Sequence, residues 1–375
     1  MVGLFPSIDI LNKKFRKNRI LMKLNYGIIG TGMMGCEHIR NLKKIPNVDI
    51  VAIADPNMRS REWAKQTCGE TFDPVLYASY EELLSKDNID IVVVASPNHT
   101  HIDVMRKIFE TDKHVLLEKP MCTNLSDGFE VLEMSKEHQG IVWIGLEYRF
   151  MAPIQSLINH VEEIGDIKML SIREHRFPFL QKVENWNRFN KNTGGTLVEK
   201  CCHFFDLMNL MMPSKPIRVY ASGGQSVNHL DEQYDGKIPD IIDNSFVLID
   251  YEDGQRAMLD LCMFAEGGKY EQEIILTGDR GKLETHIPGN ELLLTNRKLN
   301  SHSTIEIKED VRVKEIGFHH GASYVEHLEL IECIKTGNQP LVDCLDGLNS
   351  IILGMAAQES IKTGEAVNLK EFLKN

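Results

Sequence analysis

Hydrophobic and polar positions divide the chain into two stretches with different periodicities. Up to about residue 146, short runs of Val, Ile and Leu alternate with segments whose apolar residues recur every three or four positions, such as Ile102, Met105 and Ile108. Near-continuous apolar runs are typical of parallel strands that helices cover on both faces. Strands are predicted at 24–30, 50–55, 89–95, 114–118 and 142–146. The alternation predicts a doubly wound α/β domain with a parallel sheet over 23–146.

After about residue 149 the pattern changes to short strand-like segments that follow one another. Strands are predicted at 167–174, 217–222, 245–251, 256–262, 273–277 and 311–316, and helices at 196–212, 322–336 and 345–362. Segments 252–255 and 279–281 have the composition of tight turns between antiparallel neighbours. We therefore expect an α+β domain with a large, mostly antiparallel sheet over 147–375.

Composition narrows the class of protein. The chain has 375 residues and a formal charge of −12, and an acidic chain lacks the basic surface that binding to nucleic acid or an anionic membrane requires. Its apolar runs are far shorter than the ~18 residues that span a bilayer. The eight cysteines contain no CxxC pair, so we expect no structural metal, no disulfide framework and a cytoplasmic location.

Residues 1–22 do not fit the periodicity of the first domain. They contain several basic residues and lack a continuous apolar segment with a cleavage site, so a secretory signal is not predicted. The segment is interpreted as an N-terminal extension ahead of residue 23, with a basic transit peptide as the alternative.

The first predicted strand runs directly into a glycine-rich turn of the form G-x-G-x-x-G. This turn consists of Gly30, Thr31, Gly32, Met33, Met34 and Gly35. Between a strand and a helix, such glycines permit a tight turn, close approach of a pyrophosphate and close packing of helix on strand. The pattern predicts a dinucleotide-binding site.

Asp55 stands at the end of the second strand, where a carboxylate accepts hydrogen bonds from the ribose hydroxyls of NAD. The same charge would repel the 2′-phosphate of NADP, so NAD is the predicted cofactor. Arg59 and Arg61 follow closely and weaken this discrimination.

Polar residues follow two more of the predicted parallel strands. Open α/β sheets bind ligands at the carboxyl ends of their strands. The segment after residue 95 contains Ser96, Asn98 and His101, and the strand at 114–118 leads into Glu118 and Lys119. A lysine at a buried strand end requires a partner or a ligand, because a buried ammonium group is otherwise costly.

The predicted helix at 196–212 carries an acid and a histidine four residues apart. Helical spacing places Glu199, His203 and Asp206 on one face. A carboxylate beside an imidazole orients the ring and stabilises its protonated form, so the pair predicts a general base. Cys201 and Cys202 point about 100° apart on a helix, which disfavours a shared metal ion.

Taken in order, these motifs resemble the glucose–fructose oxidoreductase / inositol dehydrogenase / MocA (Gfo/Idh/MocA) family. The likeness rests on the glycine turn, Ser-Pro-Asn-x-x-His at 96–101, Glu-Lys-Pro at 118–120 and the Gly-Gly segment before Glu199 and His203. It extends from about residue 23 to the C-terminus. The chain departs from the family pattern where Glu199 replaces the usual Asp and where Asn187 displaces an arginine.

The resemblance implies roles for particular residues. Lys119 would contact both the nicotinamide ribose and the substrate, and His203 would be the base, oriented by Glu199. The residues implied in cofactor binding outside the glycine turn are Asp55, Ser96, Asn98, His101, Glu118 and Lys119. Contacts with substrate are expected from Arg149, Trp186 and Arg188. His99, His229, His319 and His320 are weaker candidates: the pair 319–320 precedes a predicted helix and could reach the substrate, but solvated loop histidines are the favoured interpretation.

The function implied is an NAD-dependent dehydrogenase that transfers hydride between nicotinamide and a secondary alcohol of a sugar, cyclitol or glycoside. Relatives also imply a homodimer or homotetramer built on the exposed face of the second sheet. Three alternatives stay open: an NAD-retaining redox glycosidase that acts through a 3-keto sugar, a glycoside 3-dehydrogenase, and a non-catalytic NAD(P)-sensing regulator such as the galactose-pathway repressor of yeasts.

Overall fold

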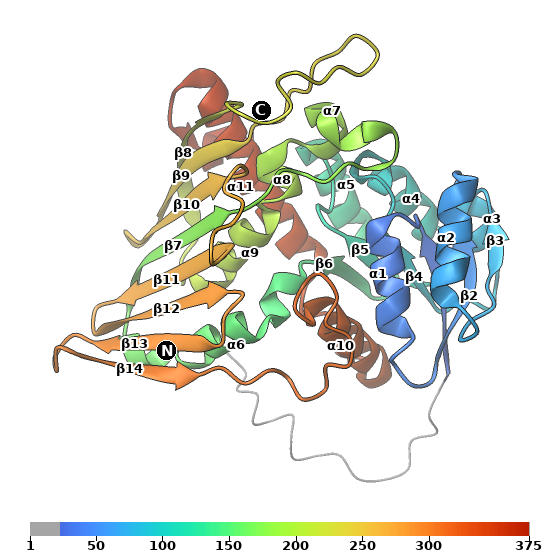
Figure 1. Cartoon of the computed structure of the whole chain (residues 1–375), viewed down its shortest axis with the longest axis horizontal. Helices are drawn as coiled ribbons and strands as arrows, with labels where there is room; N and C mark the ends of the chain where they lie inside the picture. Colours follow the sequence, from blue (N-terminus) through green and yellow to red (C-terminus); the bar gives the residue numbers. More distant parts are fainter. Residues whose placement is uncertain (1–22, 375) are drawn as a thin grey trace.

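The computed structural model describes residues 23–374 and contains two β-sheets with helices between and around them (Figure 1). The predicted N-terminal extension, residues 1–22, lies outside the described residues.

The first sheet is formed by six parallel strands in the order β3-β2-β1-β4-β5-β6. Its strands are β1 (Leu24–Ile29), β2 (Val48–Ala54), β3 (Val75–Tyr77), β4 (Ile91–Val94), β5 (His114–Glu118) and β6 (Val142–Gly145). The helices α1 (Met33–Leu42), α2 (Met58–Cys68), α3 (Tyr80–Leu84), α4 (His101–Ile108) and α5 (Leu125–Ser135) connect them, with a 3-10 turn, η2 (Asn98–Thr100), before α4. All four residues of β4 are buried, as expected for a strand covered on both faces.

The second sheet has nine strands in the order β14-β13-β12-β11-β7-β10-β9-β8-β15. They are β7 (Ile167–His175), β8 (Pro216–Gly224), β9 (Asn244–Tyr251), β10 (Arg256–Cys262), β11 (Gln272–Gly278), β12 (Gly281–Ile287), β13 (Glu291–Asn296), β14 (Ser301–Glu306) and β15 (Val367–Asn368). Only the pair β7–β10 is parallel among the described strand pairs of this sheet. Buried and exposed residues alternate along β9 and β10, so one face of the sheet is covered and the other is open.

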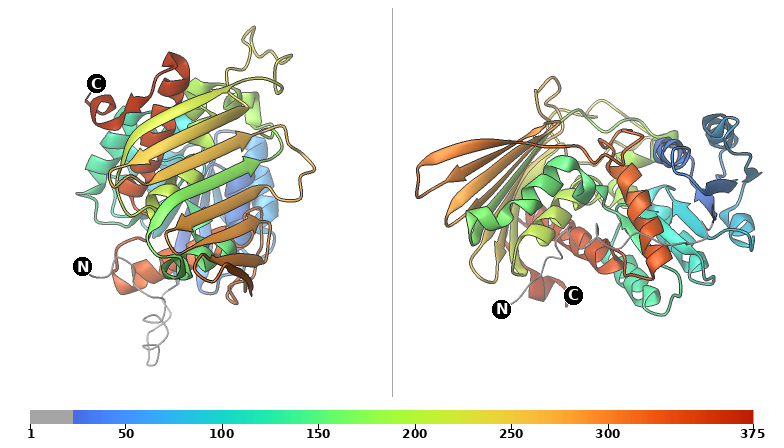
Figure 2. Two further views of the ribbon diagram at one scale, coloured as in Figure 1. Left: turned by 90° about the vertical axis from the view of Figure 1, so that its left-hand side faces the viewer. Right: turned by 90° about the horizontal axis from the view of Figure 1, so that it is seen from below.

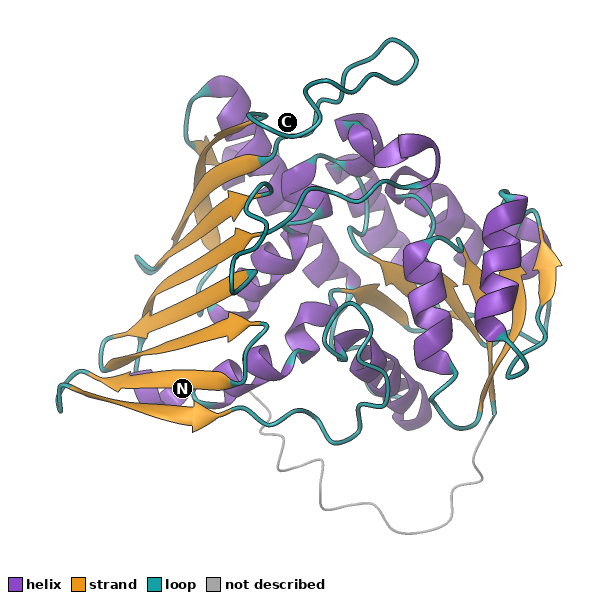
Figure 3. Ribbon diagram, viewed as in Figure 1, coloured by secondary structure: helices purple, strands orange, loops and turns teal. Residues whose placement is uncertain are grey.

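Helices pack on the covered face and also contact the first sheet. The helical elements that follow β6 are η3 (Glu147–Phe150), α6 (Ala152–Asn159), η4 (Val161–Ile164), η5 (Val183–Arg188), α7 (Asn190–Thr193), α8 (Thr196–Glu199), α9 (Cys202–Met211), α10 (Ala322–Thr336), α11 (Cys344–Thr363) and α12 (Leu369–Phe372). Helix α11 packs against α9 and β8 on one side and against α5 on the other, and α10 packs against α1. Figure 3 shows these helices between the two sheets, and Figure 2 shows the opposite face of the nine-stranded sheet with no helix over it.

The predicted fold class is confirmed, with a parallel sheet followed by a mostly antiparallel one. The predicted strand at 311–316 is wrong: this segment is a loop in which Val311 is 98% exposed. Its apolar alternation finds no neighbouring strand, and Arg312 instead forms ion pairs with Asp310 and Glu329. Strands β3, β12, β13, β14 and β15 were not predicted, and the helix predicted at 196–212 is interrupted between α8 and α9.

No helix in the described part of the chain is both long and apolar enough to cross a membrane.

Candidate active site

The glycine turn after β1 lies between the carboxyl ends of β2 and β4, because β1 pairs with both strands. Gly30 has a φ of +83°, and a Cβ there would lie 2.4 Å from the backbone nitrogen of Ser96. A Cβ on Gly35 would lie 2.1 Å from the carbonyl oxygen of Gly30. The first glycine therefore permits the turn, and the third permits α1 to pack closely against it, as predicted.

Gly32 differs from the other two glycines, because a Cβ built on it would meet no heavy atom within 4 Å. It is the N-cap residue of α1 and provides no side-chain hydrogen bond to the first turn. Open space in front of an uncapped helix N-terminus suits a phosphate group. The turn therefore fits the pyrophosphate of a dinucleotide.

The carboxylate of Asp55 lies beside this turn. One oxygen, Oδ2, accepts hydrogen bonds from the amide of Thr31 at 2.8 Å and from its hydroxyl at 3.2 Å, and Oδ1 accepts one from the amide of Asn57 at 2.8 Å. These bonds fix the carboxylate at the end of β2. The guanidinium of Arg61 is bound to the backbone carbonyls of Asp55 and Pro56.

The segment after β4 is tied to the segment after β5 by His101. The ring of His101 is fully buried, with Nε2 at 3.1 Å from the carbonyl oxygen of Ser96 and Nδ1 at 2.9 Å from that of Pro120. Both ring nitrogens are thus occupied by backbone, so the structure places His101 as a link between the two strand ends. Asn98 is also buried, but its Nδ2 has no hydrogen-bond partner among the described residues. A buried amide without a partner fits a site that a ligand completes.

Lys119 extends from the end of β5 to the interruption between α8 and α9. Its ammonium group donates a hydrogen bond to the carbonyl oxygen of Glu199 at 3.3 Å, a carbonyl made accessible by the break in the helix. Burial opposes the charged form, but the surrounding groups, chiefly Cys202, Glu118 and Glu147, raise the pKa of this amine above its ordinary value. Lys119 is therefore a cation at neutral pH.

Glu118 contacts a residue of α1. Its carboxylate lies 2.9 Å from Nε2 of His38, and Nδ1 of the same ring lies 2.9 Å from Nε2 of His327. Burial would raise the pKa of Glu118, but the hydrogen bond and charge of His38 lower it to about 2. Glu118 thus joins the strand end that carries Lys119 to the helix that follows the glycine turn.

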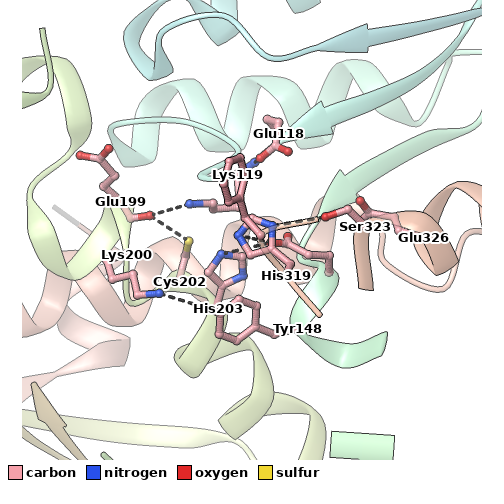
Figure 4. Close-up of polar contacts among 12 residues, drawn as sticks. Glu118, Lys119, Tyr148, Glu199, Lys200, Cys202, His203, His319, Ser323 and Glu326 are labelled. Atoms are coloured by element: carbon pink, nitrogen blue, oxygen red, sulfur yellow. Dashed lines mark hydrogen bonds and ion pairs between the residues drawn. The ribbon is translucent and has the colours of Figure 1, made fainter. Parts of the chain in front are cut away.

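The imidazole of His203 on α9 is 1% exposed and stacks on the ring of Tyr148, with 4.1 Å between the ring centroids (Figure 4). Its Nδ1 has no hydrogen-bond partner among the described residues, and its Nε2 lies 3.8 Å from an oxygen of Glu147. Burial, followed by the positive charges of Lys119 and Lys200, holds the pKa of His203 well below its ordinary value. The ring is therefore neutral at neutral pH, and its buried Nδ1 is available to accept or donate a proton.

Glu199 does not lie against His203, contrary to the prediction from helical spacing. The interruption after α8 breaks the common face, and the Glu199 carboxylate points toward Lys182, whose Nζ is 3.9 Å away. One carboxylate oxygen, Oε2, is buried without a partner among the described residues, and burial raises the pKa of the group. Asp206, the third residue of the predicted face, is paired with Arg149.

Two residues at this site were not predicted from the sequence. Glu147, in η3 directly after β6, is the carboxylate beside His203, and neither of its oxygens has a hydrogen-bond partner among the described residues. Its Oε1 is also 3.4 Å from Nε2 of His319, whose Nδ1 lies 3.4 Å from Glu37 and 3.3 Å from the Ser323 hydroxyl. His319 thus lies in this cluster with a side chain only 18% exposed, which agrees with the alternative that it reaches the site and not with the favoured interpretation as a solvated loop histidine.

The three predicted substrate contacts have different surroundings. Arg149 is bound by Asp206 and Asp346 and by the carbonyl of Leu341, so its guanidinium is already occupied. Arg188 is buried and paired with Glu232 at 3.0 Å.

Trp186 lies next to Lys182, the lysine that faces Glu199. Its ring is 4.8 Å from Nζ of Lys182 and 6.2 Å from the ring of His99. Arg188 also acts on this part of the site, because its charge lowers the pKa of Glu199 and its Nη1 is buried without a partner among the described residues.

The arrangement can perform acid–base chemistry on a hydroxyl group. A charged lysine from β5 and a neutral imidazole from α9 lie in one cluster (Figure 4), next to the strand ends that fit a dinucleotide. Among residues 23–374, no group of three or more His, Cys, Asp and Glu side chains is arranged to hold a metal ion.

Two family models match the chain. Residues 24–146 match the NAD-binding Rossmann fold of the Gfo/Idh/MocA oxidoreductase family, and residues 157–369 match the C-terminal alpha/beta domain of the same family.

Curated relatives and solved structures agree with these matches. Myo-inositol 2-dehydrogenase of Thermotoga maritima is 28% identical over 357 residues, which are 93% of this chain and 100% of the relative. The scyllo-inositol 2-dehydrogenase (NAD(+)) of Bacillus subtilis is 24% identical over 349 residues, 91% and 95% of the two chains. Levoglucosan dehydrogenase, solved with NADH and levoglucosan, has the same fold, with a TM-score of 0.80, 19% identity and coverage of 92% and 99%.

The two family matches follow the order of the two sheets and together account for most of the chain. The chain therefore belongs to the Gfo/Idh/MocA oxidoreductase family, with an NAD-binding Rossmann-fold domain followed by the family's C-terminal domain.

Proposed function

We propose that the protein is an NAD-dependent dehydrogenase that oxidises a secondary alcohol of a sugar, cyclitol or glycoside. The observation that supports this best is the pairing of two groups next to the strand ends that fit a dinucleotide. His203 is buried and neutral, its Nδ1 has no partner among the described residues, and the cationic Lys119 lies nearby. Two relatives named as inositol dehydrogenases, which match the chain over more than nine-tenths of its length, support the substrate class.

In the proposed reaction Lys119 donates a hydrogen bond to the oxygen of the reacting hydroxyl, and its charge stabilises the alkoxide that develops there. His203 accepts the hydroxyl proton at Nδ1. When bound, NAD supplies the hydride acceptor, while the protein provides positioning and charge. In the reverse direction protonated His203 returns the proton to the carbonyl oxygen.

Glu199, Lys182 and Trp186 are proposed to bind the rest of the substrate. The partnerless Oε2 of Glu199 can accept a hydrogen bond from a second hydroxyl, and Lys182 can donate one. The Trp186 ring beside them supplies an apolar surface for a sugar or cyclitol ring. In this proposal Glu199 contacts the substrate instead of orienting His203.

The open face of the nine-stranded sheet is proposed to bind a second copy of the chain, as a homodimer or as half of a homotetramer. Large apolar side chains are exposed on this face, among them Met169, Tyr220, Phe246 and Leu248, with exposures of 56%, 44%, 61% and 51%. An apolar patch of this kind is typical of an interaction surface.

A reducing compartment such as the cytoplasm is the proposed location. All eight cysteines lie within the described residues and are free thiols, and seven of them are buried. Buried thiols without disulfides are typical of proteins that fold under reducing conditions.

The proposal is tested with a panel of polyols, cyclitols, aldoses and glycosides, each with NAD and with NADP, by following the absorbance of the reduced cofactor. We expect stoichiometric formation of NADH and ketone from at least one cyclitol or sugar. Hydrolysis of a glycoside without net NADH would instead indicate the redox glycosidase. Tight NAD binding with no turnover of any compound would indicate a non-catalytic regulator, and both results would refute the dehydrogenase.

A further inference from the structure

We propose that Glu147 and His319 form a proton relay that carries the substrate's proton from His203 to solvent. This inference rests on the proposed dehydrogenase function and deepens it, because oxidation of an alcohol releases one proton in every turnover.

The relay is needed because His203 has almost no direct contact with solvent. Its side chain is 1% exposed, and Tyr148 covers one face of the ring. Bound substrate and cofactor would cover the ring further. A proton accepted by His203 therefore has to leave through a neighbouring group.

The two ring nitrogens of His203 suit different steps of such a transfer. Nδ1 is free of partners within the described chain, so it can receive the proton of the substrate hydroxyl. Nε2 faces Oε1 of Glu147 at 3.8 Å and can pass a proton to it. This distance is about 1 Å longer than a hydrogen bond, a gap that a small side-chain movement or one bridging water closes.

The surroundings of Glu147 suit a carboxylate that carries a proton rather than one that only stabilises the fold. A buried carboxylate that only stabilises the fold is normally held by several hydrogen bonds. Glu147 is 2% exposed and has none, and its Oε1 faces two imidazoles, at 3.8 Å and 3.4 Å. Burial raises the pKa of Glu147, which brings its protonated form within reach.

His319 provides the exit. Its side chain is 18% exposed, whereas those of His203 and Glu147 are 1% and 2% exposed. Its Nε2 faces Glu147, and its Nδ1 lies beside Glu37 and the Ser323 hydroxyl, so the ring joins the buried carboxylate to a more exposed position. Figure 4 shows the contact between His319 and Ser323. The charged or titratable groups around it are Glu37, Glu118, Lys119, Glu147, His203 and His320.

The protons balance over one turnover. Burial opposes the charged form of His319, but Glu147 and Glu37 raise its pKa, and the two carboxylates beside the ring favour its protonated form at rest. When Glu147 accepts the proton from His203, its negative charge disappears and His319 releases its own proton to water. Glu147 then protonates His319, and rotation of the two imidazole rings returns each to its resting tautomer, with one proton delivered to solvent in each turnover.

The coupling is tested first without any substrate, by NMR titration of labelled histidine side chains. The His319 resonance is identified as the signal missing from His319→Asn. In Glu147→Gln the pKa of His319 should fall, since the carboxylate that raises it is gone. Glu326→Gln is the matched control: Glu326 is another buried glutamate near the site, its carboxylate accepts a hydrogen bond from the Trp143 indole, and within the described chain it forms no hydrogen bond or ion pair with His319. Equal His319 titration in wild type and Glu147→Gln would overturn the relay, whether or not the protein oxidises cyclitols.

The kinetic test compares His319→Asn with His320→Asn. His320 is adjacent, has a φ of +53° that asparagine tolerates, and forms no contact with Glu147. We expect His319→Asn to lower kcat for oxidation about 10-fold, with KM unchanged, a larger effect of D₂O on the rate, and recovery as imidazole is added to the buffer. Equal rates in the two variants, or no recovery with imidazole, would contradict the relay. If the pKa of His319 falls in Glu147→Gln but the protein oxidises no compound of the panel, the proposed function is refuted and the coupling between Glu147 and His319 is still supported.

Discussion

At the scale of single residues, the site depends on how its surroundings set the charge of each group. Lys119 is kept charged although it is buried, and His203 is kept neutral by burial and by the neighbouring cations. A charged donor and a neutral acceptor on one hydroxyl form the pair that alcohol oxidation requires.

This difference predicts the pH dependence of the reaction. The neutral form of His203 is the base, and its pKa lies well below the ordinary value. The rate of oxidation should therefore be near its plateau at neutral pH and should fall only at lower pH, as the ring becomes protonated. A profile of kcat against pH measures this directly. A rate that continues to rise tenfold per unit above neutrality would contradict the assignment of His203.

The structure also predicts which carboxylate affects that profile. Glu147 lies 3.8 Å from His203, whereas the Glu199 carboxylate lies beside Lys182. Glu147→Gln should move the acid limb to lower pH, because the charge that favours imidazolium is lost. Glu199→Gln should leave the limb in place and raise KM. The opposite pattern, with the shift in Glu199→Gln alone, would restore the role suggested by helical spacing.

Asp55 is predicted to set the choice of cofactor. Its carboxylate is held at the end of β2 by backbone amides, where it would bind the ribose hydroxyls of NAD and repel the phosphate of NADP. NAD should be preferred at least tenfold in kcat/KM, or ~1.4 kcal/mol, and Asp55→Ser should narrow the gap chiefly through KM. Equal use of the two cofactors by the unaltered protein would contradict this role.

Candidate site residues that belong to sequence motifs could be predicted. Residues that reach the site only through the packing of distant elements could not. Lys119 and His203 occur at recognisable positions after a strand and on a helix. His319 lies in an aperiodic loop and meets Glu147 only because α10 packs near α1 and η3. One signal was available: Glu147 follows β6 directly, at the same edge of the sheet as Lys119.

At the scale of elements, two substitutions in the glycine turn distinguish an effect on folding from an effect on cofactor binding. Gly35→Ala places a methyl group 2.1 Å from the carbonyl of Gly30, so α1 must shift and the melting temperature should fall. Gly32→Ala places it in open space, so the melting temperature without cofactor should be unchanged. Both variants should bind NAD at least tenfold more weakly, as measured by calorimetry. Unchanged NAD affinity in Gly32→Ala would show that the cofactor does not approach this turn.

Most elements followed from periodicity, and the exceptions have physical reasons. The buried strands of the first sheet are near-continuous apolar runs, and the inner strands of the second sheet alternate. Strand β14 is a polar edge strand with the sequence SHSTIE, so no apolar pattern marks it. The interruption between α8 and α9 lies in a segment whose composition suits a continuous helix. The break leaves the carbonyl oxygen of Glu199 free to accept a hydrogen bond from Lys119, a tertiary contact that the local sequence does not reveal.

At the scale of the whole molecule, the open face of the nine-stranded sheet predicts self-association. Phe246→Asp puts a charge among the exposed apolar residues of β8 and β9 and should halve the mass measured by light scattering, from dimer to monomer or from tetramer to dimer. Val311→Asp, on a fully exposed loop residue, is the control and should leave the mass unchanged. A monomeric wild-type protein, or equal masses of all three proteins, would contradict the proposed interface.

The most direct measurement of the central claim is single-turnover oxidation of the best substrate by the wild type and by His203→Ala and Lys119→Ala. Each variant should form NADH ~10²–10⁴-fold more slowly, the usual range for positioned acid–base groups. The double variant should be little slower than the worse single one, because both residues act on one proton transfer. NAD binding should survive in His203→Ala, since His203 lies on α9 and not on the glycine turn. If His203→Ala keeps more than about a third of the wild-type rate, the base lies elsewhere and the proposed mechanism is wrong.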